Sequence, residues 1–230
     1  MFVGRKKELH FLEDLCTSKK FEMLIMHGRR RVGKSFLLAH FASNHNQDTV
    51  FFTADKGSEK DNVQRFCMEL KRVLNAGDFL DSLETWQSVY SFIESTEITK
   101  RITIIIDEFT YLYNSNPAYD SGLQNAIDRI LKNKNIFLIL CGSEVSVIEE
   151  LFDNSTKPLY GRKTADLKLK PFTYKEAKAF SRNTITKKSL LPIPSSVACL
   201  FIFLFLTIPF PSAKTLSRIV YLPPDTCSTK

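Results

Sequence analysis

The amino-acid sequence predicts an α/β protein in which a mostly parallel sheet is flanked by helices. Two observations support this fold class. Apolar runs of strand length alternate with helix-patterned stretches, and the unbroken β-branched run at residues 102–106 suits a strand that is covered on both faces. With 230 residues, of which 43% are hydrophobic, the chain can bury a sizeable core.

Five strands and four helices are expected in chain order. Apolar runs of strand length lie at residues 21–27, 49–54, 102–106, 136–141 and 166–169. Apolar residues at helical spacing predict helices over residues 34–43, 58–74, 83–95 and 122–131. The alternation of the two patterns is what favours parallel strands, because a helix then returns the chain to the start of the next strand.

The composition changes abruptly near residue 183. All eight glycines lie at or before Gly161, whereas six of the nine prolines lie after residue 190. Residues 177–230 hold seven basic residues and one acidic residue, which accounts for +6 of the net charge of +7. We therefore expect a folded domain over residues 1–183 and an apolar, proline-rich tail without a recognisable domain over residues 184–230. The body is close to neutral, so the pI of 9.1 does not indicate a phosphate-binding face.

The cysteines and the N-terminus indicate the cellular compartment. The five cysteines are spread far apart and include no C-x-x-C pair, so neither a disulfide scaffold nor a zinc site is expected. The N-terminal residues carry charges from Arg5 onward and lack the apolar segment of a secretion signal. A cytoplasmic location with free thiols is therefore expected.

The strongest functional signal is a motif of the form G-x-x-x-x-G-K-[ST], placed between an apolar run and a helix-patterned stretch. Its residues are Gly28, Arg29, Arg30, Arg31, Val32, Gly33, Lys34 and Ser35. In such a motif the glycines let the loop wrap closely around phosphates, to which backbone N–H groups at the helix start point. Lys34 is expected to reach the β- and γ-phosphates, and the Ser35 hydroxyl to ligate Mg²⁺. The alternative is a basic, glycine-containing turn, and the three arginines are equally compatible with a solvated turn.

A second signal is the pair of acids that follows the apolar run at residues 102–106. Asp107 would hold Mg²⁺, mostly through water, and Glu108 would polarise the attacking water. The adjacent glutamate indicates a hydrolase that carries its own base rather than a passive binder. Without the phosphate loop, the same pair could simply be a solvated strand end.

Ser143 follows the apolar run at residues 136–141 and has two interpretations. As a sensor, its hydroxyl would contact the γ-phosphate or the attacking water. As a helix N-cap, it would precede the apolar stretch 145–151, since serine is a preferred cap residue. The two roles are compatible, and the sequence leaves both open.

Taken together, these residues resemble the archaeal-type ATPases in the STAND branch of the P-loop NTPases, which are related to AAA+ and origin-recognition-type ATPases. The resemblance covers about residues 2–182. It rests on the phosphate loop GRRRVGKS and on FVGRKKEL at 2–9, IIDEF at 105–109, LQNAID at 123–128, LILCGS at 138–143, PLYGR at 158–162 and LKPFTYKEA at 169–177.

The resemblance implies an additional-strand (ASCE-type) sheet, with a strand inserted between the strand of the phosphate loop and that of the acid pair. The apolar run at residues 49–54 is the candidate for this strand. The resemblance also implies that Arg5 lies near the nucleotide base or ribose and that Arg162 acts as an arginine finger or sensor arginine. From the residues alone, an exposed turn arginine after Gly161 is the favoured interpretation of Arg162.

The sequence departs from this family after about residue 183. Residues 189–213 form an uncharged stretch of 25 residues, but four prolines interrupt it and only residues 197–208 are continuously apolar. A membrane anchor is therefore not favoured. The tail is expected to be unrelated to the family, as in a truncated or frameshifted gene.

The sequence thus predicts a cytoplasmic, Mg²⁺-dependent P-loop ATPase that binds ATP and acts on an unknown protein or DNA client, as a possible homo-oligomer. One alternative is a truncated remnant that binds ATP without turnover. Another is a STAND-type regulatory switch with slow hydrolysis, and a third is a membrane-tethered ATPase.

Overall fold

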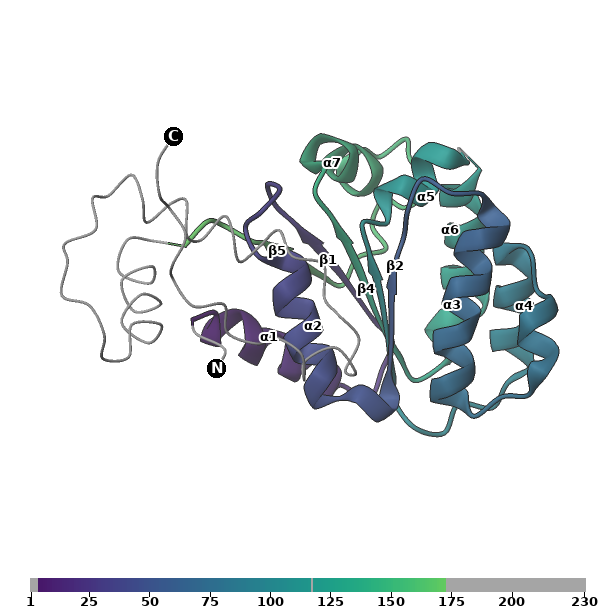
Figure 1. The fold of residues 1–230 in the computed structure, drawn as a ribbon. Coiled ribbons are helices and arrows are strands. Elements are labelled where there is room, and N and C mark those ends of the chain that lie inside the picture. Colours follow the sequence, from purple (N-terminus) through teal and green to yellow (C-terminus); the bar gives the residue numbers. More distant parts are fainter. Residues whose placement is uncertain (1–3, 117, 173–230) are drawn as a thin grey trace, which may run out of the picture. The chain divides into compact units, whose positions relative to one another are not determined.

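The computed structural model describes residues 4–116 and 118–172, and these form a single five-stranded parallel sheet with helices on both faces (Figure 1). The strand order is β2-β3-β4-β1-β5, and every pairing between neighbours is parallel. The strands are β1 (Glu22–His27), β2 (Thr49–Thr53), β3 (Ile102–Asp107), β4 (Ile136–Gly142) and β5 (Ala165–Lys168). The predicted fold class is therefore confirmed.

Two layers of helices cover the sheet, and short helices cap one of its ends. Figure 1 shows α1 (Lys6–Cys16) and α2 (Lys34–Asn44) on one face, with α3 (Glu59–Leu74), α4 (Trp86–Ser95) and α6 (Tyr119–Arg129) on the other. The helices α5 (Thr110–Ser115) and α7 (Val145–Asp153) lie at the end of the sheet where the strands finish. Three short 3₁₀ turns complete the described elements: η1 (Asn46–Asp48), η2 (Asp78–Ser82) and η3 (Leu131–Asn133).

The sheet separates two apolar cores, and successive residues of each strand enter opposite ones. In β1, Met23 and Ile25 pack toward α3, α4 and α6, whereas Leu24 and Met26 pack toward α1 and α2. Every residue of β1, β3 and β4 is buried. This burial on both faces explains why these strands read as unbroken apolar runs rather than as alternating patterns.

The expected element boundaries agree with the structure to within a few residues, and two helix starts differ. The helix expected from residue 83 begins at Trp86, because the Thr85 side chain accepts a hydrogen bond from the Ser88 amide and caps it there. The helix expected from residue 122 begins at Tyr119. Just before it, the Asn116 side chain accepts a hydrogen bond from the Ala118 amide. Asx turns of this kind start a helix before its apolar pattern becomes visible.

The expectation about the inserted strand is wrong in one respect. A strand does lie between β1 and β3, but it is β4 rather than the run at residues 49–54, which forms the edge strand β2. Burial explains the difference: all seven residues of β4 are buried, whereas Thr53 at the end of β2 is exposed. An entirely apolar run suits the middle of the sheet, and a run bounded by threonines suits its edge.

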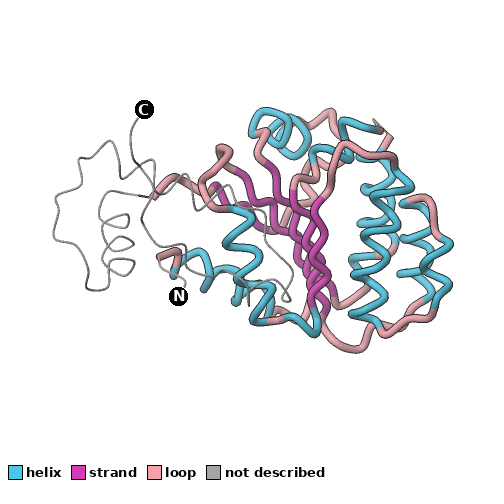
Figure 2. Tube along the Cα trace, in the orientation of Figure 1, coloured by secondary structure: helices cyan, strands magenta, loops and turns pink. Residues whose placement is uncertain are grey.

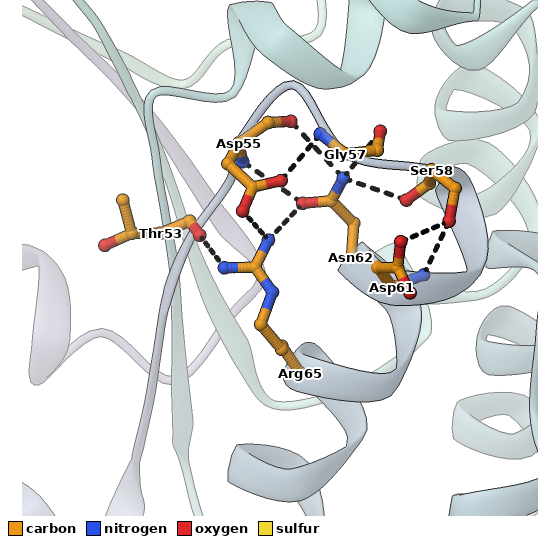
Figure 3. A network of polar contacts seen from close by, with 7 residues as sticks. All are labelled: Thr53, Asp55, Gly57, Ser58, Asp61, Asn62 and Arg65. Atoms are coloured by element: carbon orange, nitrogen blue, oxygen red, sulfur yellow. Dashed lines mark hydrogen bonds and ion pairs between the residues drawn. The ribbon is translucent and has the colours of Figure 1, made fainter.

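A network of polar contacts fixes the connection between β2 and α3 (Figure 3). The fully buried Asn62 side chain accepts the Asp55 amide at 3.1 Å and donates to the backbone carbonyl oxygens of Asp55, Gly57 and Ser58 at 3.1–3.4 Å. Arg65 donates to the Asn62 amide oxygen at 2.8 Å and pairs with the Asp55 carboxylate at 2.8 Å. One buried side chain therefore satisfies four backbone groups of this loop, which has no regular secondary structure of its own.

We predict that Asn62→Ala lowers the free energy of unfolding by about 2–3 kcal/mol, because buried backbone groups lose their partners. Urea denaturation of the purified protein measures this change. Gln64→Ala, in the same helix at a partly buried position without a hydrogen bond to the described residues, should cost less than about 1 kcal/mol. Equal losses for the two variants would contradict the role given to Asn62.

Residues 184–230, including the uncharged stretch at 189–213, lie outside the described part of the chain. Among the helices of residues 4–116 and 118–172, none has the length and apolarity needed to cross a membrane.

Candidate functional site

The loop formed by residues 28–35 joins the end of β1 to the start of α2, and its two glycines have backbone conformations that other residues rarely adopt. Gly28 has φ 151° and Gly33 has φ 91°. A Cβ atom at Gly28 would lie 2.4 Å from the Leu169 carbonyl oxygen, so the loop can pass this segment only without a side chain. A Cβ atom at Gly33 would meet nothing within 4 Å, which leaves open space beside the start of α2. The local fold is thus a loop that passes close to Leu169 at one glycine and is open beside the other.

Lys34 is held inside this loop. Its side chain is only 5% exposed, and Nζ donates to the carbonyl oxygens of Gly28 at 2.9 Å and Arg29 at 3.1 Å. No carboxylate of the described residues pairs with it. Both of its partners are neutral carbonyl groups, so the ammonium charge remains available to an anion that enters the loop.

The three arginines and Ser35 lie on the outer side of the loop. Arg29, Arg30 and Ser35 are exposed, and Arg31 adopts φ 68°. The Arg30 guanidinium is 3.9 Å from the Glu144 carboxylate, which also accepts a hydrogen bond from the Asn114 amide at 3.4 Å. Exposed pairs of this kind contribute little to stability. This ion pair therefore does little to fix the Arg30 side chain.

Asp107 and Glu108 lie at the end of β3. Asp107 is 2% exposed, and its Oδ1 accepts the Glu108 amide at 3.0 Å. Glu108 adopts a left-handed conformation with φ 53°, which costs roughly 1–2 kcal/mol for a residue with a side chain. Such strain is retained where the surrounding structure requires it, often at functional sites. Burial raises the pKa of the neighbouring Cys141 thiol, and the Asp107 carboxylate adds to this increase, so the thiol stays neutral.

Ser143 is directed at the acid pair. Its hydroxyl donates to Glu108 Oε2 at 2.9 Å. The interpretation of Ser143 as the N-cap of α7 is not supported, because Glu144 occupies the cap position and no side chain caps this helix. The serine therefore connects the end of β4 to the acid at the end of β3.

The register of the sheet brings these groups to one edge. His27 pairs with Gly142, and Ile106 pairs with Leu140, so β1, β4 and β3 end at nearly the same level. Figure 2 shows the loops that leave these strands at the same end of the sheet. With neighbouring strands about 4.8 Å apart, the phosphate loop and the acid pair are separated by roughly 10 Å, with the Ser143 turn between them.

Arg5 contacts the loop but does not point freely into it. Its guanidinium is 6% exposed and donates to the carbonyl oxygens of Val32 at 3.1 Å and Lys170 at 2.6 Å. It also forms an ion pair with Glu8 at 2.9 Å and lies 4.2 Å from the Phe172 ring centroid. Arg5 thus ties the phosphate loop to the segment that follows β5. The sequence motif points to Arg5 but not to this role; the close approach of Gly28 to Leu169 is the only feature of the motif that relates to it.

Arg162 is not brought to this edge. It donates to the Asp128 carboxylate at 2.7 and 3.1 Å and to the Tyr160 carbonyl oxygen at 3.0 Å. The hydrogen bond from Arg162 is the main reason why the pKa of Asp128 lies below its usual range. Two residues later, the Thr164 amide bonds to the Met23 carbonyl oxygen near the start of β1. Arg162 therefore lies near the end of the sheet where β1 begins. At about 3.3 Å per residue, this places it roughly 20 Å from the phosphate loop.

Comparison with solved structures identifies the fold as that of P-loop ATPases. A Walker-type ATPase of Pyrococcus abyssi is similar to this chain with a TM-score of 0.58 and 19% identity, over 88% of this chain and 63% of that one. Cdc6p from Pyrobaculum aerophilum is similar with a TM-score of 0.53 and 16% identity, over 78% and 48%. The ADP form of the Aeropyrum pernix ORC2 protein gives a TM-score of 0.52 and 12% identity, over 80% and 52%.

The chain belongs to the family of ATPase domains that occur predominantly in Archaea, whose pattern matches residues 2–195. A protein of Methanocaldococcus jannaschii is 33% identical over 180 residues, which is 78% of this chain and 38% of the relative. An ATP-binding protein of the same organism is 50% identical over 44 residues, which is 19% of this chain and 75% of that protein. The chain thus spans well under half the length of the first relative. The expected resemblance to archaeal-type ATPases is confirmed, and the match extends beyond the expected end at about residue 182.

We predict that Gly28→Ala reduces ATP affinity by at least about tenfold and destabilises the fold by roughly 1–3 kcal/mol, because its Cβ would collide with the Leu169 carbonyl. Calorimetric titration with ATP and urea denaturation measure the two effects. Gly77→Ala is the matched control, since a Cβ there meets nothing within 4 Å and the residue has φ −72°. Wild-type affinity in Gly28→Ala would show that the close passage is not required.

Proposed function

We propose that the chain binds ATP in the loop of residues 28–35 and hydrolyses it in a Mg²⁺-dependent reaction. The observation that carries this proposal is the strained Glu108, fixed by Ser143 at the same sheet edge as the buried Lys34. Membership in the ATPase family supports the reaction class. The open space beside Gly33 supports the binding of phosphates at the start of α2.

The donor groups at this edge fit Mg²⁺. Ser35 offers an exposed hydroxyl and Asp107 a carboxylate, and such hard oxygen ligands are what Mg²⁺ prefers together with phosphate oxygens and water. We propose these two residues as its ligands, Asp107 mostly through water. When bound, the ion neutralises charge on the phosphates.

The remaining steps belong to the residues of the chain. The backbone amides at the start of α2 and the Lys34 ammonium hold the β- and γ-phosphates, with help from the three arginines of the loop. The Glu108 carboxylate orients and deprotonates the attacking water. Ser143 holds that carboxylate through its hydroxyl, and a γ-phosphate that attracts the same hydroxyl would release Glu108 for catalysis.

A regulatory switch with little turnover is the second candidate. It is favoured by the position of Arg162, which is bonded to Asp128 at the opposite end of the sheet and leaves the site without this arginine in cis. An arginine that contributes charge to the transition state accelerates phosphoryl transfer by about 10³-fold or more. A single copy of the chain would then bind ATP and hydrolyse it slowly.

Assembly would provide the missing arginine. We propose that the chain works in the cytoplasm as a homo-oligomer in which one copy supplies Arg162 to another, and that its client is a protein or DNA. Likeness to Cdc6p and to origin-recognition proteins, one of them solved on DNA, supports a search for DNA binding. Residues 1–176 carry almost no net charge, so composition alone does not point to a DNA-binding surface.

We predict that Glu108→Gln retains ATP binding but lowers the hydrolysis rate by at least about 10²-fold, because the amide keeps the shape and loses the base. Lys34→Ala is the opposite control and should lose most ATP affinity. Phosphate release and calorimetric ATP binding, with and without Mg²⁺, separate the two effects. Hydrolysis that survives in Glu108→Gln would assign the base to another residue.

We predict that Arg162→Ala and Lys34→Ala are each inactive alone and that their mixture recovers hydrolysis, since it pairs an intact Lys34 with an intact Arg162. Wild-type activity should also rise with protein concentration. Circular dichroism checks that both variants are folded. Absence of recovery, with both proteins folded, would argue for action of Arg162 within one copy or for a turn arginine that serves only as the partner of Asp128.

A further inference from the structure

Lys56 is an unpaired cation at the edge of the sheet where the proposed ATP site lies. It is exposed, and it forms no ion pair with any residue in 4–116 or 118–172. Its Nζ lies 5.7 Å from the centroid of the Tyr111 ring. Tyr111 is in the first turn of α5, and its amide bonds to the Glu108 carbonyl oxygen at 3.0 Å. Lys56 is therefore placed against the turn that begins at Glu108.

The register explains how the loop after β2 comes to lie beside the acid pair. Thr53 pairs with Asp107, and the Ala54 amide extends the ladder by bonding to the Asp107 carbonyl oxygen at 2.9 Å. Lys56 follows two residues later. Figure 1 shows this connection and α5 at the same end of the sheet. The end of β2 is thus the neighbour of the Asp107–Glu108 turn on the side away from β4.

The other polar groups of this loop have partners. Asn62 fixes the backbone around Lys56, and Arg65 neutralises Asp55 and bonds to the Thr53 carbonyl oxygen at 3.3 Å (Figure 3). The nearby Asp61 accepts a hydrogen bond from Ser58. The only charge of residues 53–58 that these contacts leave uncompensated is that of Lys56. A network that orders a loop and spares one cation suggests an anion as the missing partner.

We propose that Lys56 contacts the terminal phosphate of bound ATP from the side opposite Lys34. The strands β1 and β2 are three places apart in the sheet, or roughly 14 Å, a gap that two lysine side chains and a phosphoryl group can bridge together. Lys56 would supply, within one copy of the chain, positive charge that Arg162 cannot supply there. This inference rests on the proposed ATP site and adds a phosphate-contacting residue to it.

The test compares affinities for a non-hydrolysable ATP analogue and for ADP, because only the former has the terminal phosphate. Calorimetric titrations with Mg²⁺ should show that Lys56→Ala weakens binding of the analogue about tenfold and leaves ADP binding unchanged. Lys56→Arg should keep most of the affinity, since the charge remains. The matched control is Lys60→Ala, which removes an exposed lysine of the same segment that already pairs with Glu84.

The outcomes separate this inference from the proposed function. If the wild type binds the analogue more tightly than ADP and Lys56→Ala does the same, Lys56 does not contact the phosphate. If Lys56→Ala and Lys60→Ala lose affinity equally, the effect is a general loss of surface charge and the inference is wrong. If the wild type binds neither nucleotide, the ATP site itself is wrong, and Lys34→Ala will likewise show no change.

Discussion

The site depends above all on the common level at which β1, β4 and β3 end. Because His27 lies opposite Gly142 and Ile106 opposite Leu140, three different turns leave the sheet beside one another. A shift of one residue would exchange the two faces of a strand, so the apolar cores on both sides of the sheet fix this register. The buried runs therefore do more than stabilise the fold, since they also set the separation between Lys34 and Glu108.

The phosphate loop itself is held in place by contacts with the segment that follows β5. The Leu169 amide bonds to the His27 carbonyl oxygen at 2.7 Å, and Arg5 joins the Val32 and Lys170 carbonyl oxygens. These contacts come from both ends of the described chain and meet at the loop. Any displacement of residues 169–172 would act first on them. The loop and the segment that follows β5 are thus connected through neutral backbone groups and one buried guanidinium.

The sequence was sufficient for the five strands and for α2, α3, α4 and α6, but it did not predict α1 or α5, and it did not give every spatial relation. Apolar runs located all five strands, yet periodicity carries no information on strand order, and β4 rather than β2 proved to be the inserted strand. The pairing of Ser143 with Glu108 depends on two strands that are far apart in sequence, so the local signal for an N-cap competed with it. No local sequence pattern predicts the contact between Arg162 and Asp128, because this contact depends on how α6 and the segment before β5 pack.

In the proposed function, the hydrogen bond from Ser143 keeps the Glu108 carboxylate occupied until a ligand arrives. Glu108 is fixed by its left-handed backbone and by the Ser143 hydroxyl. Glu144, the residue after Ser143, lies beside Arg30 of the phosphate loop. A triphosphate brought into the loop would compete for the Ser143 hydroxyl and repel Glu144, because like charges that approach within a few ångströms destabilise each other. Both effects act on β4 and α7, and neither requires the sheet to move. Under the proposed function, a bound nucleotide would therefore change hydrogen-bond partners at the β4–α7 turn rather than the fold.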